Sequence, residues 1–506
     1  MMVAARRCRA TTSTTTARTW TRRRACRAAP AARRRGGVRS RASAVDDDTD
    51  GAAASSSSVP VFPYLQTAST PSTMFTEHAW GESVELQSSL LRAMRIQWTH
   101  GFTSTPKGYP KCTHGFGEIL AGMQAAACDA IFDVLPGDSV MDPFMGGGTT
   151  LIVGQTKGRR AIGVDVSPLS CFVSTHRNWR ASSASLDALS ALVSDAADMA
   201  KTGEFSAPPV AVSSDDDGVV ASEDSGVPKP WRPMRDALRA RLAKVSASEV
   251  DARVFEAAWF CLSVAVQRTQ KSSNKRRPKG KGKSGGSGNI VSDNADKFVK
   301  ITDEYVKRVL EFQAVCNQHD PAAPEASIHN MDIRLFNLKD EDKVDAVLTS
   351  CVYPGVYDYQ SFARKVRAGS GAVVTSSDAE AQPLSSTFLT TTVPGDRHWP
   401  KEWLEGEIGS RKALRSDPYS FKETWQRDTD AWVAVVADCL KSGGRAAIMV
   451  GDGANINTRT SIIEAGAKSG LIELAGCTMK HVGGTLSDGS IYNQARTEHL
   501  ILLQKP

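Results

Sequence analysis

The sequence lacks several features that would assign a protein to a class at once. None of its apolar runs approaches the roughly 20 residues that a membrane-spanning helix requires. None of its ten cysteines forms a Cys-x-x-Cys pair or lies in a cluster with histidines, which argues against a zinc site and against a disulfide framework. We therefore expect a soluble protein of a reducing compartment, with no membrane and no metal among its partners.

Acidic residues are absent from the first 44 positions, which contain thirteen arginines from Arg6 to Arg41. Subtracting these charges from the net charge of +7 leaves −6 for the remaining chain. An Arg-rich, Ser/Thr-rich and acid-free segment is typical of an organellar transit peptide. A disordered basic arm that binds nucleic acid is the alternative. We predict a transit peptide over residues 1–44, for the chloroplast first because of its Ser/Thr content and the mitochondrion second, followed by a linker over residues 45–85.

Short apolar runs alternate with helical patterns over most of the remaining chain. Buried strands are predicted over residues 138–142, 160–165, 344–350 and 445–451, and a helix is predicted over residues 117–134. Strands that alternate with helices predict an α/β fold with a mostly parallel sheet. Two closely joined strands near the end of the chain predict a hairpin at one edge of that sheet.

Two stretches interrupt this alternation and split the α/β domain into residues 86–200 and 325–506. The first is an acidic disordered linker over residues 201–230. The second is a helical insertion over residues 231–324, whose basic loop at 268–283 has eight Lys or Arg and no acid. This loop suggests contacts with phosphate, and a solvated loop without a partner is the alternative. The candidate nucleic-acid contacts are Arg268, Lys275, Arg276, Arg277 and Lys279.

A glycine turn separates the strand that ends at Asp142 from a helix that begins at Thr149. Glycines let a ligand approach the backbone closely. An acid at the end of the next strand, here Asp165, can accept hydrogen bonds from both hydroxyls of a ribose. The turn has neither the Gly-x-Gly-x-x-Gly pattern of dinucleotide sites nor the Gly-Lys-Ser/Thr of phosphate loops. Asp142 would repel a pyrophosphate and attract a cationic amino group, which favours S-adenosylmethionine over NAD. The alternative for Asp165 is a helix N-cap.

The stretch "DPFMGGGTT" resembles the motif Asp-Pro-Phe-x-Gly-x-Gly-Thr-Thr of the amino-group DNA methyltransferases, the N4-cytosine and N6-adenine class. The resemblance covers residues 95–175 and 325–505. It implies a class I methyltransferase, Rossmann-like fold: a seven-stranded, mostly parallel sheet with one antiparallel strand, plus the helical insertion. Asp332, in "HNMDIRLFNL", resembles an acid of the third motif that bonds the adenine amino group, and a surface turn is the alternative. The residues implied to bind S-adenosylmethionine are Asp142, Pro143, Phe144, Gly146, Gly148, Thr149, Thr150, Asp165 and Asp332.

The stretch "TSCVYPGVYDY" resembles the Thr-Ser-Pro-Pro-Tyr form of the same family's catalytic motif. Ser350 and Tyr353 are in register, whereas Cys351 and Val352 replace the two prolines. The resemblance implies that the polar side chain and a loop carbonyl accept the hydrogens of a base amino group, while the aromatic ring stacks on the extracted base. Prolines fix φ and aim that carbonyl, and a preorganised acceptor can lower a barrier by several kcal/mol. We therefore expect restored prolines to raise activity.

Three functions remain open for this stretch. The first is a working N-methyltransferase, for cytosine N4 in DNA according to the family tendency of Ser350. The second is a non-catalytic relative that still binds cofactor or nucleic acid. In the third, the Cys351 thiolate attacks a pyrimidine for carbon methylation, and a plain core role for Cys351 is the remaining alternative. DNA is expected ahead of RNA, although RNA stays open because no separate recognition domain is visible.

Overall fold

The structure is a computed structural model, and its described residues all lie in one compact unit, Pro60–Pro506. They are residues 75–100, 105–117, 119, 122–204, 228–244, 252–275, 290–320, 323–359, 407–481, 484–485, 491–492 and 496–506. The predicted transit peptide and most of the two predicted linkers lie outside these residues.

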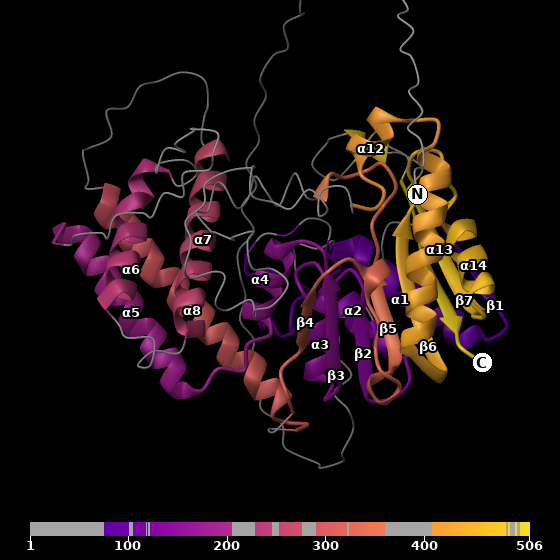
Figure 1. The fold of residues 1–506 in the computed structure, drawn as a ribbon, viewed down its shortest axis with the longest axis horizontal. Helices are drawn as coiled ribbons and strands as arrows, with labels where there is room; N and C mark the ends of the chain where they lie inside the picture. The colour runs from indigo at the N-terminus through magenta and orange to yellow at the C-terminus, as the bar shows by residue number, and fades with distance from the viewer. Residues whose placement is uncertain are drawn as a thin grey trace, which may run out of the picture. The chain divides into compact units, whose positions relative to one another are not determined.

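An eight-stranded sheet forms the centre of the described chain, in the order β1-β7-β10-β6-β5-β2-β3-β4 (Figure 1). Strands β2 to β6 run parallel, β10 runs antiparallel to both β6 and β7, and β1 runs antiparallel to β7. The strands of this sheet are β1 (Phe75–Gly81), β2 (Ser139–Asp142), β3 (Arg160–Asp165), β4 (Ser327–Asn330), β5 (Val344–Ser350), β6 (Leu440–Gly451), β7 (Ile472–His481) and β10 (Arg496–Gln504). A separate two-stranded sheet pairs β8 (Gly484–Thr485) with β9 (Ile491–Tyr492).

The class I methyltransferase fold is confirmed by this strand order, and three details of the prediction are wrong. The sheet has eight strands in place of seven and two antiparallel strands, β10 and β1, in place of one, because Phe75–Gly81 forms β1 within the predicted linker. The two late strands, β7 and β10, do pair as predicted, but β7 is not an edge because β1 covers it. Strand β1 escaped prediction because an edge strand can carry charged and polar residues, as "TEHAW" does.

Neighbouring residues on the central strands point into two different cores. Val140 and Leu348 belong to the core that α1, α2 and α3 cover, whereas Met141 and Val347 belong to the core that α13 and α14 cover. Side chains alternate across a strand, so a parallel sheet covered on both faces needs the continuous apolar runs seen in the sequence. The helices around the sheet are α1 (Val84–His100), α2 (Ala125–Phe132), α3 (Thr149–Thr156), α4 (Pro168–Arg177), α12 (Arg411–Ser416), α13 (Phe421–Cys439) and α14 (Thr458–Lys468), with the short helices η3 (Ile333–Leu335) and η4 (Asp340–Asp342).

The helix predicted over residues 117–134 is shorter than expected. Helix α2 begins only after Gln124, whose side chain accepts a hydrogen bond from the backbone N–H of Ala127. A side chain that satisfies an open N–H of the first turn fixes where a helix starts. The residues before Gln124 therefore lie outside the helix. Among them, Phe116 and Gly117 bond the Arg177 side chain that also bonds the glycine turn.

A layer of four helices has its own hydrophobic core. Three of them, α6 (Arg232–Lys244), α7 (Ala252–Lys275) and α8 (Ile290–Cys316), lie within the predicted insertion, and the short helix η2 (Lys229–Trp231) precedes them. The fourth, α5 (Ser183–Thr202), precedes the acidic linker in sequence but contributes Leu189 and Val193 to the same core. The helical layer therefore starts earlier in the chain than the predicted insertion.

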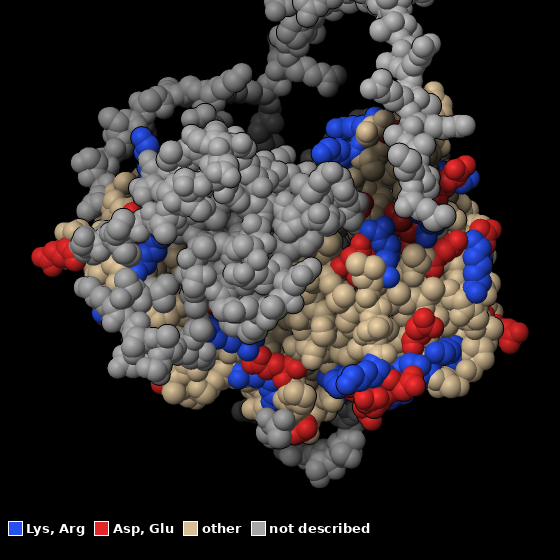
Figure 2. All heavy atoms as spheres, in the orientation of Figure 1, with Lys and Arg blue, Asp and Glu red and all other residues tan. Residues whose placement is uncertain are grey.

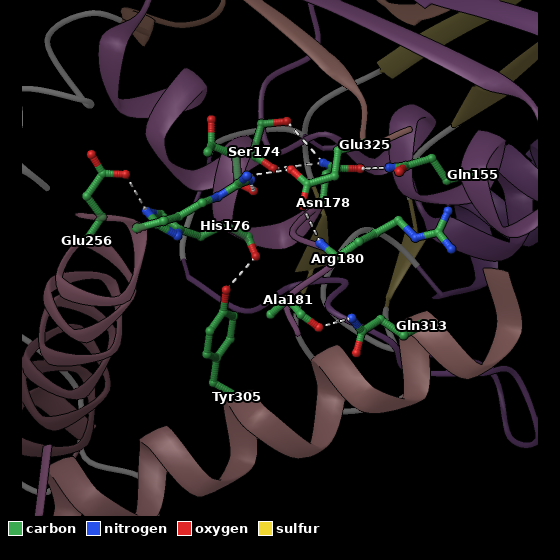
Figure 3. Close-up of polar contacts among 12 residues, drawn as sticks. Gln155, Ser174, His176, Asn178, Arg180, Ala181, Glu256, Tyr305, Gln313 and Glu325 are labelled. Atoms are coloured by element: carbon green, nitrogen blue, oxygen red, sulfur yellow. Dashed lines mark hydrogen bonds and ion pairs between the residues drawn. The ribbon is translucent and has the colours of Figure 1, made fainter. Parts of the chain in front are cut away.

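The connection from α4 to α5 fastens the helical layer to the sheet (Figure 3). The hydroxyl of Tyr305 on α8 donates to the carbonyl oxygen of His176 at 2.6 Å, and the backbone N–H of Arg180 donates to Glu325 at 2.7 Å. The His176 ring is fully buried and stacks on Phe260, and burial lowers the pKa of its imidazole well below the usual range. An uncharged ring packed between aromatic groups holds the two layers together.

Candidate cofactor and target site

The predicted site residues gather at one edge of the sheet. Asp142, Asp165 and Ser350 are the last residues of β2, β3 and β5, and these strands run parallel to one another. Their carboxyl ends therefore lie side by side, which is where open α/β sheets bind ligands.

Asp142 joins the glycine turn of residues 142–150, here called the cofactor turn, to β5, the strand that precedes residues 350–359, here called the target loop. Its Oδ1 accepts hydrogen bonds from the backbone N–H of Phe144 at 3.0 Å and from the hydroxyl of Thr349 at 2.7 Å. Burial raises the pKa of this carboxyl to about 6, while hydrogen bonds from Thr150, Thr349 and Phe144 oppose the rise. A buried carboxylate that is bonded by three uncharged donors is well placed to take a positive ligand group.

Asp165 holds the glycine turn from the neighbouring strand. Its Oδ2 accepts from the N–H of Gly146 at 2.9 Å, and its Oδ1 accepts from the N–H of Ser167 at 2.8 Å. Burial raises the pKa of its carboxyl to about 6. The N-cap alternative is wrong, because Ser167 itself caps α4 through the N–H of Ser170.

The three glycines of the turn serve two purposes. Gly146 and Gly148 have φ values of +48° and +72°, which glycine adopts without strain. A Cβ at Gly148 would overlap Ser174, and a Cβ at Gly147 would overlap the guanidinium of Arg177. A Cβ at Gly146 would meet no atom closer than 3.6 Å. The turn is therefore packed tightly against the protein at two glycines and leaves room at the third.

Arg177 is a supporting residue that the sequence did not reveal. Its side chain is buried and donates to the carbonyl oxygens of Gly147 and Phe116, each at 2.8 Å, and also to that of Gly117. Burial, with the nearby charge of Arg308, lowers the pKa of the guanidinium to about 9. A basic residue in the last turn of a helix is common for dipole reasons alone, which is why its role went unnoticed.

The segment "THGF" at 113–116 is held beside the turn by hydrogen bonds. The hydroxyl of Thr113 donates to the carbonyl of Arg177, and Arg308 on α8 donates to the carbonyl of His114 at 3.0 Å. Burial, reinforced by the charges of Arg177 and Arg308, lowers the pKa of His114 to about 3. His114 is therefore neutral at physiological pH, and the segment is held by the helical layer.

Cys351 is packed into the core at the start of the target loop. Its thiol is 1% exposed, and its N–H donates to the carbonyl of Met449 at 3.0 Å. Burial, and then the charge of Asp142, raises the pKa of the thiol above its usual value. A nucleophilic cysteine needs a lowered pKa and access, so the hypothesis of a Cys351 nucleophile is not supported, and the core alternative fits.

Tyr353 is also largely enclosed. Its hydroxyl donates to Oε1 of Glu498 at 2.7 Å, and 7% of the residue is exposed. Its ring lies against Gly451, where a Cβ would come within 2.5 Å of a ring carbon. The structure thus shows where the Tyr353 ring packs, whereas the stacking of this ring on a base stays a prediction.

Contacts from residues 407–412 hold the rest of the target loop. The N–H of Gly355 donates to the carbonyl of Gly409 at 2.8 Å. Asp358 accepts from the N–H of Lys412 at 2.7 Å and pairs with Arg411. These side chains and backbone groups supply restraints in the absence of the two prolines.

Asp332 lies beside the end of β3 but is engaged locally. It caps η3 by accepting from the N–H of Arg334 at 2.9 Å, and its other oxygen pairs with the same guanidinium at 2.6 Å. Arg334 in turn contacts Asp428 at 2.9 Å. These contacts fit the surface-turn alternative, and adenine binding by Asp332 stays a prediction.

The predicted basic loop begins inside a helix. Arg268 lies on α7, pairs with Glu304 at 2.6 Å and covers the ring of Phe116 at 5.2 Å. Helix α7 continues to Lys275, so the loop starts later than predicted and Arg268 has an intramolecular role. The side chain of Lys275 and the whole of Arg276, Arg277 and Lys279 lie outside the described residues.

Residues 134–172 match the family model described as DNA methylase, of the N6/N4 methyltransferase type. The match begins just before β2 and spans the cofactor turn, α3, β3 and the start of α4. Over these residues the chain is similar to the amino-group methyltransferases. This similarity supports a methyltransferase that uses S-adenosylmethionine and acts on nucleic acid.

No curated protein matches this methyltransferase. Among solved structures, the rRNA methyltransferase AviRa from Streptomyces viridochromogenes aligns with 79% of this chain and 90% of its own, at 11% identity and a TM-score of 0.25. The fold is assigned from the strand order given above.

No group of three or more His, Cys, Asp or Glu side chains among the described residues could hold a metal ion. No helix among those residues is long and apolar enough to cross a membrane. The eight cysteines in the described ranges are all buried and unpaired.

Proposed function

We propose that this methyltransferase transfers a methyl group from S-adenosylmethionine to an exocyclic amino group of a nucleic-acid base, with cytosine N4 in DNA as the first candidate. The observation that carries the proposal is the position of Asp142. This one buried carboxylate bonds the cofactor turn at Phe144 and also Thr349, the residue directly before Ser350. The groups for a cationic cofactor and for a target base thus share one edge of the sheet.

The residues at this edge fit the cofactor. Asp142 would receive the cationic amino group of the methionine part, and Asp165 the ribose hydroxyls, since a carboxylate has about four acceptor sites and three donors bond each of these two. Gly146 leaves space for a ligand beside the backbone. When bound, S-adenosylmethionine supplies an electrophilic methyl group.

The target loop would prepare the attacking nitrogen. The lone pair of a base amino group is delocalised into the ring, so the nitrogen is a poor nucleophile. The Ser350 hydroxyl and a backbone carbonyl of the loop would accept its two hydrogens, which localises the lone pair and leaves an acceptor for the proton that departs.

Basic residues beside the loop support a nucleic-acid partner. Arg411, Lys412 and Arg415 are exposed on α12, and Figure 2 shows Lys and Arg side chains gathered over this helix. Because Arg411 and Lys412 also bond Asp358 of the target loop, these charges lie next to the place where a base would enter. Phosphates that flank the base are their expected partners.

Calorimetry with S-adenosylmethionine tests the cofactor site, using Asp142→Asn as the test variant. We expect binding by the wild type and at least a hundredfold weaker binding by the variant, because the amide removes the charge that receives the amino group. Asp345→Asn is the matched control: Asp345 lies on β5 toward the opposite edge and bonds Ser139 and Lys441. Equal affinity in wild type and Asp142→Asn would contradict the assignment.

Nucleoside mass spectrometry after incubation with DNA or RNA tests the reaction. N4-methylcytosine in DNA is the expected product, and N6-methyladenine or a methylated RNA base would correct the substrate. The non-catalytic alternative is favoured by the missing prolines and the enclosed Tyr353. It predicts cofactor binding with no methylated nucleoside in either nucleic acid.

We also propose import into an organelle, the chloroplast first. The support is the acid-free, arginine-rich composition of residues 1–44. Fusion of this segment to a fluorescent protein should direct it to plastids. Fluorescence confined to the cytosol or the nucleus would favour the basic-arm alternative.

A further inference from the structure

The bond between Tyr353 and Glu498 joins the target loop to the antiparallel strand. Its donor and acceptor lie 2.7 Å apart, and Glu498 is 1% exposed. Glu498 pairs across the sheet with Gly451, the glycine on which the Tyr353 ring rests. Burying a carboxyl group in a strand is energetically unfavourable. Its presence beneath the target loop therefore suggests that Glu498 has a specific role there.

The hydroxyl of Tyr353 has no part in the proposed chemistry. Stacking on a base uses the face of an aromatic ring, for which phenylalanine serves equally. The hydroxyl is instead directed to a carboxyl group on another strand. It therefore fixes where the ring, and with it the backbone of residues 350–353, sits relative to the sheet.

We propose that Glu498 is a positioning residue for the target loop, acting through the Tyr353 hydroxyl and replacing the restraint that two prolines would give. The inference rests on the proposed function in one respect, because it assigns to residues 350–353 the presentation of a base amino group. The positions of the Tyr353 ring and the Glu498 carboxyl are both fixed by the sheet. Gly451 on β6 leaves space for the ring, and Glu498 on β10 provides the hydrogen-bond acceptor.

Hydrogen exchange measured by mass spectrometry tests the positioning directly. Tyr353→Phe and Glu498→Ala should each raise the exchange of peptides that cover residues 351–359 by about tenfold, the effect of one lost buried hydrogen bond. Glu498→Gln keeps an acceptor oxygen and should stay near the wild-type rate. Tyr305→Phe is the matched control, since it also removes a buried hydroxyl but lies on α8. It should leave the exchange of residues 351–359 unchanged.

Kinetics separate positioning from general destabilisation. In Tyr353→Phe and Glu498→Ala we expect kcat to fall about tenfold, while the affinity for S-adenosylmethionine is kept. The double variant should lose no more than the more severe single variant, because both changes remove the same bond. Glu498→Gln should restore most of kcat.

Each outcome bears on one claim. Unchanged exchange over residues 351–359 in both Tyr353→Phe and Glu498→Ala overturns the positioning role, whatever the activity. If wild-type protein transfers no methyl group, the proposed function fails, and the exchange data still decide whether Glu498 fixes the loop. Additive losses in the double variant would show that the two residues act separately and would also overturn the inference.

Discussion

The cofactor turn (residues 142–150) and the target loop (residues 350–359) follow neighbouring parallel strands, yet they are held by different means. The turn depends on its own glycines, two of them left-handed, and on Arg177 bonded to its backbone. The loop depends on side chains from distant parts of the chain, Glu498 on β10 and the segment 407–412. A local motif therefore remains recognisable in the turn, whereas the loop can change sequence as long as its distant contacts persist.

Gly147→Ala should have the largest effect of the changes considered, and it acts on the cofactor turn. The new Cβ would overlap the Arg177 guanidinium, which would have to leave its buried carbonyl partners. We expect the free energy of unfolding in urea to drop by about 3–5 kcal/mol, as for other disrupted buried charges. Gly122→Ala is the control, since a Cβ there meets nothing within 4 Å. A similar loss in both variants would refute the tight-turn account.

Single proline substitutions test how the target loop is restrained. The N–H of Cys351 donates to Met449, so Cys351→Pro removes a hydrogen bond and should lower stability by about 2–3 kcal/mol. Val352→Pro leaves that bond intact and should raise kcat about threefold by stiffening the loop. Restoring both prolines, as the sequence alone suggested, is therefore not the best test. Thermal denaturation and single-turnover assays measure both effects, and higher stability in Cys351→Pro would contradict this interpretation.

A pH series probes the two acids of the cofactor side. The pKa values of Asp142 and Asp165 rise from 3.8 to about 6 on folding, so the folded state binds these protons more tightly than the unfolded state. Their contribution to the stability of the ligand-free protein is therefore greatest below pH 4 and is lost as the pH rises to about 6. Asp142→Asn should flatten this dependence in denaturation curves recorded from pH 4 to pH 7.

Cofactor affinity should follow the opposite course. A cationic ligand prefers the ionised carboxylates, so the affinity for S-adenosylmethionine should fall about tenfold between pH 7 and pH 5 for a single group with this pKa. Calorimetry across that range measures the change. An affinity that is constant down to pH 5 would mean that neither acid contacts the charged group.

Arg415→Glu should have the smallest effect and tests whether the loop side faces nucleic acid. Losing one phosphate contact should weaken binding several-fold at low salt and reduce the slope of log affinity against log salt by about 1. Binding of S-adenosylmethionine should be unchanged. Lys300→Glu on α8, also exposed, serves as the control. Equal losses in the two variants would indicate a general charge effect without a defined surface.

The sequence predicted the elements whose information is local. The central strands are short apolar runs, and the cofactor turn is a contiguous motif, so Asp142 and Asp165 lie where expected. Arg177 and Glu498 could not be found in this way, because their partners are distant in the chain and each side chain looks ordinary in its own element. Strand β1 was missed for a related reason, since its polar residues suit an edge and give no apolar pattern.

Strand β1 has a consequence for the processing of the protein. All seven of its residues, Phe75 to Gly81, pair with β7, and β1 is the first described element after the proposed leader of residues 1–44. A peptidase that removed the proposed leader would have to stop before Phe75. Cleavage further along would uncover the backbone of β7 and leave an open template on which other chains could add strands.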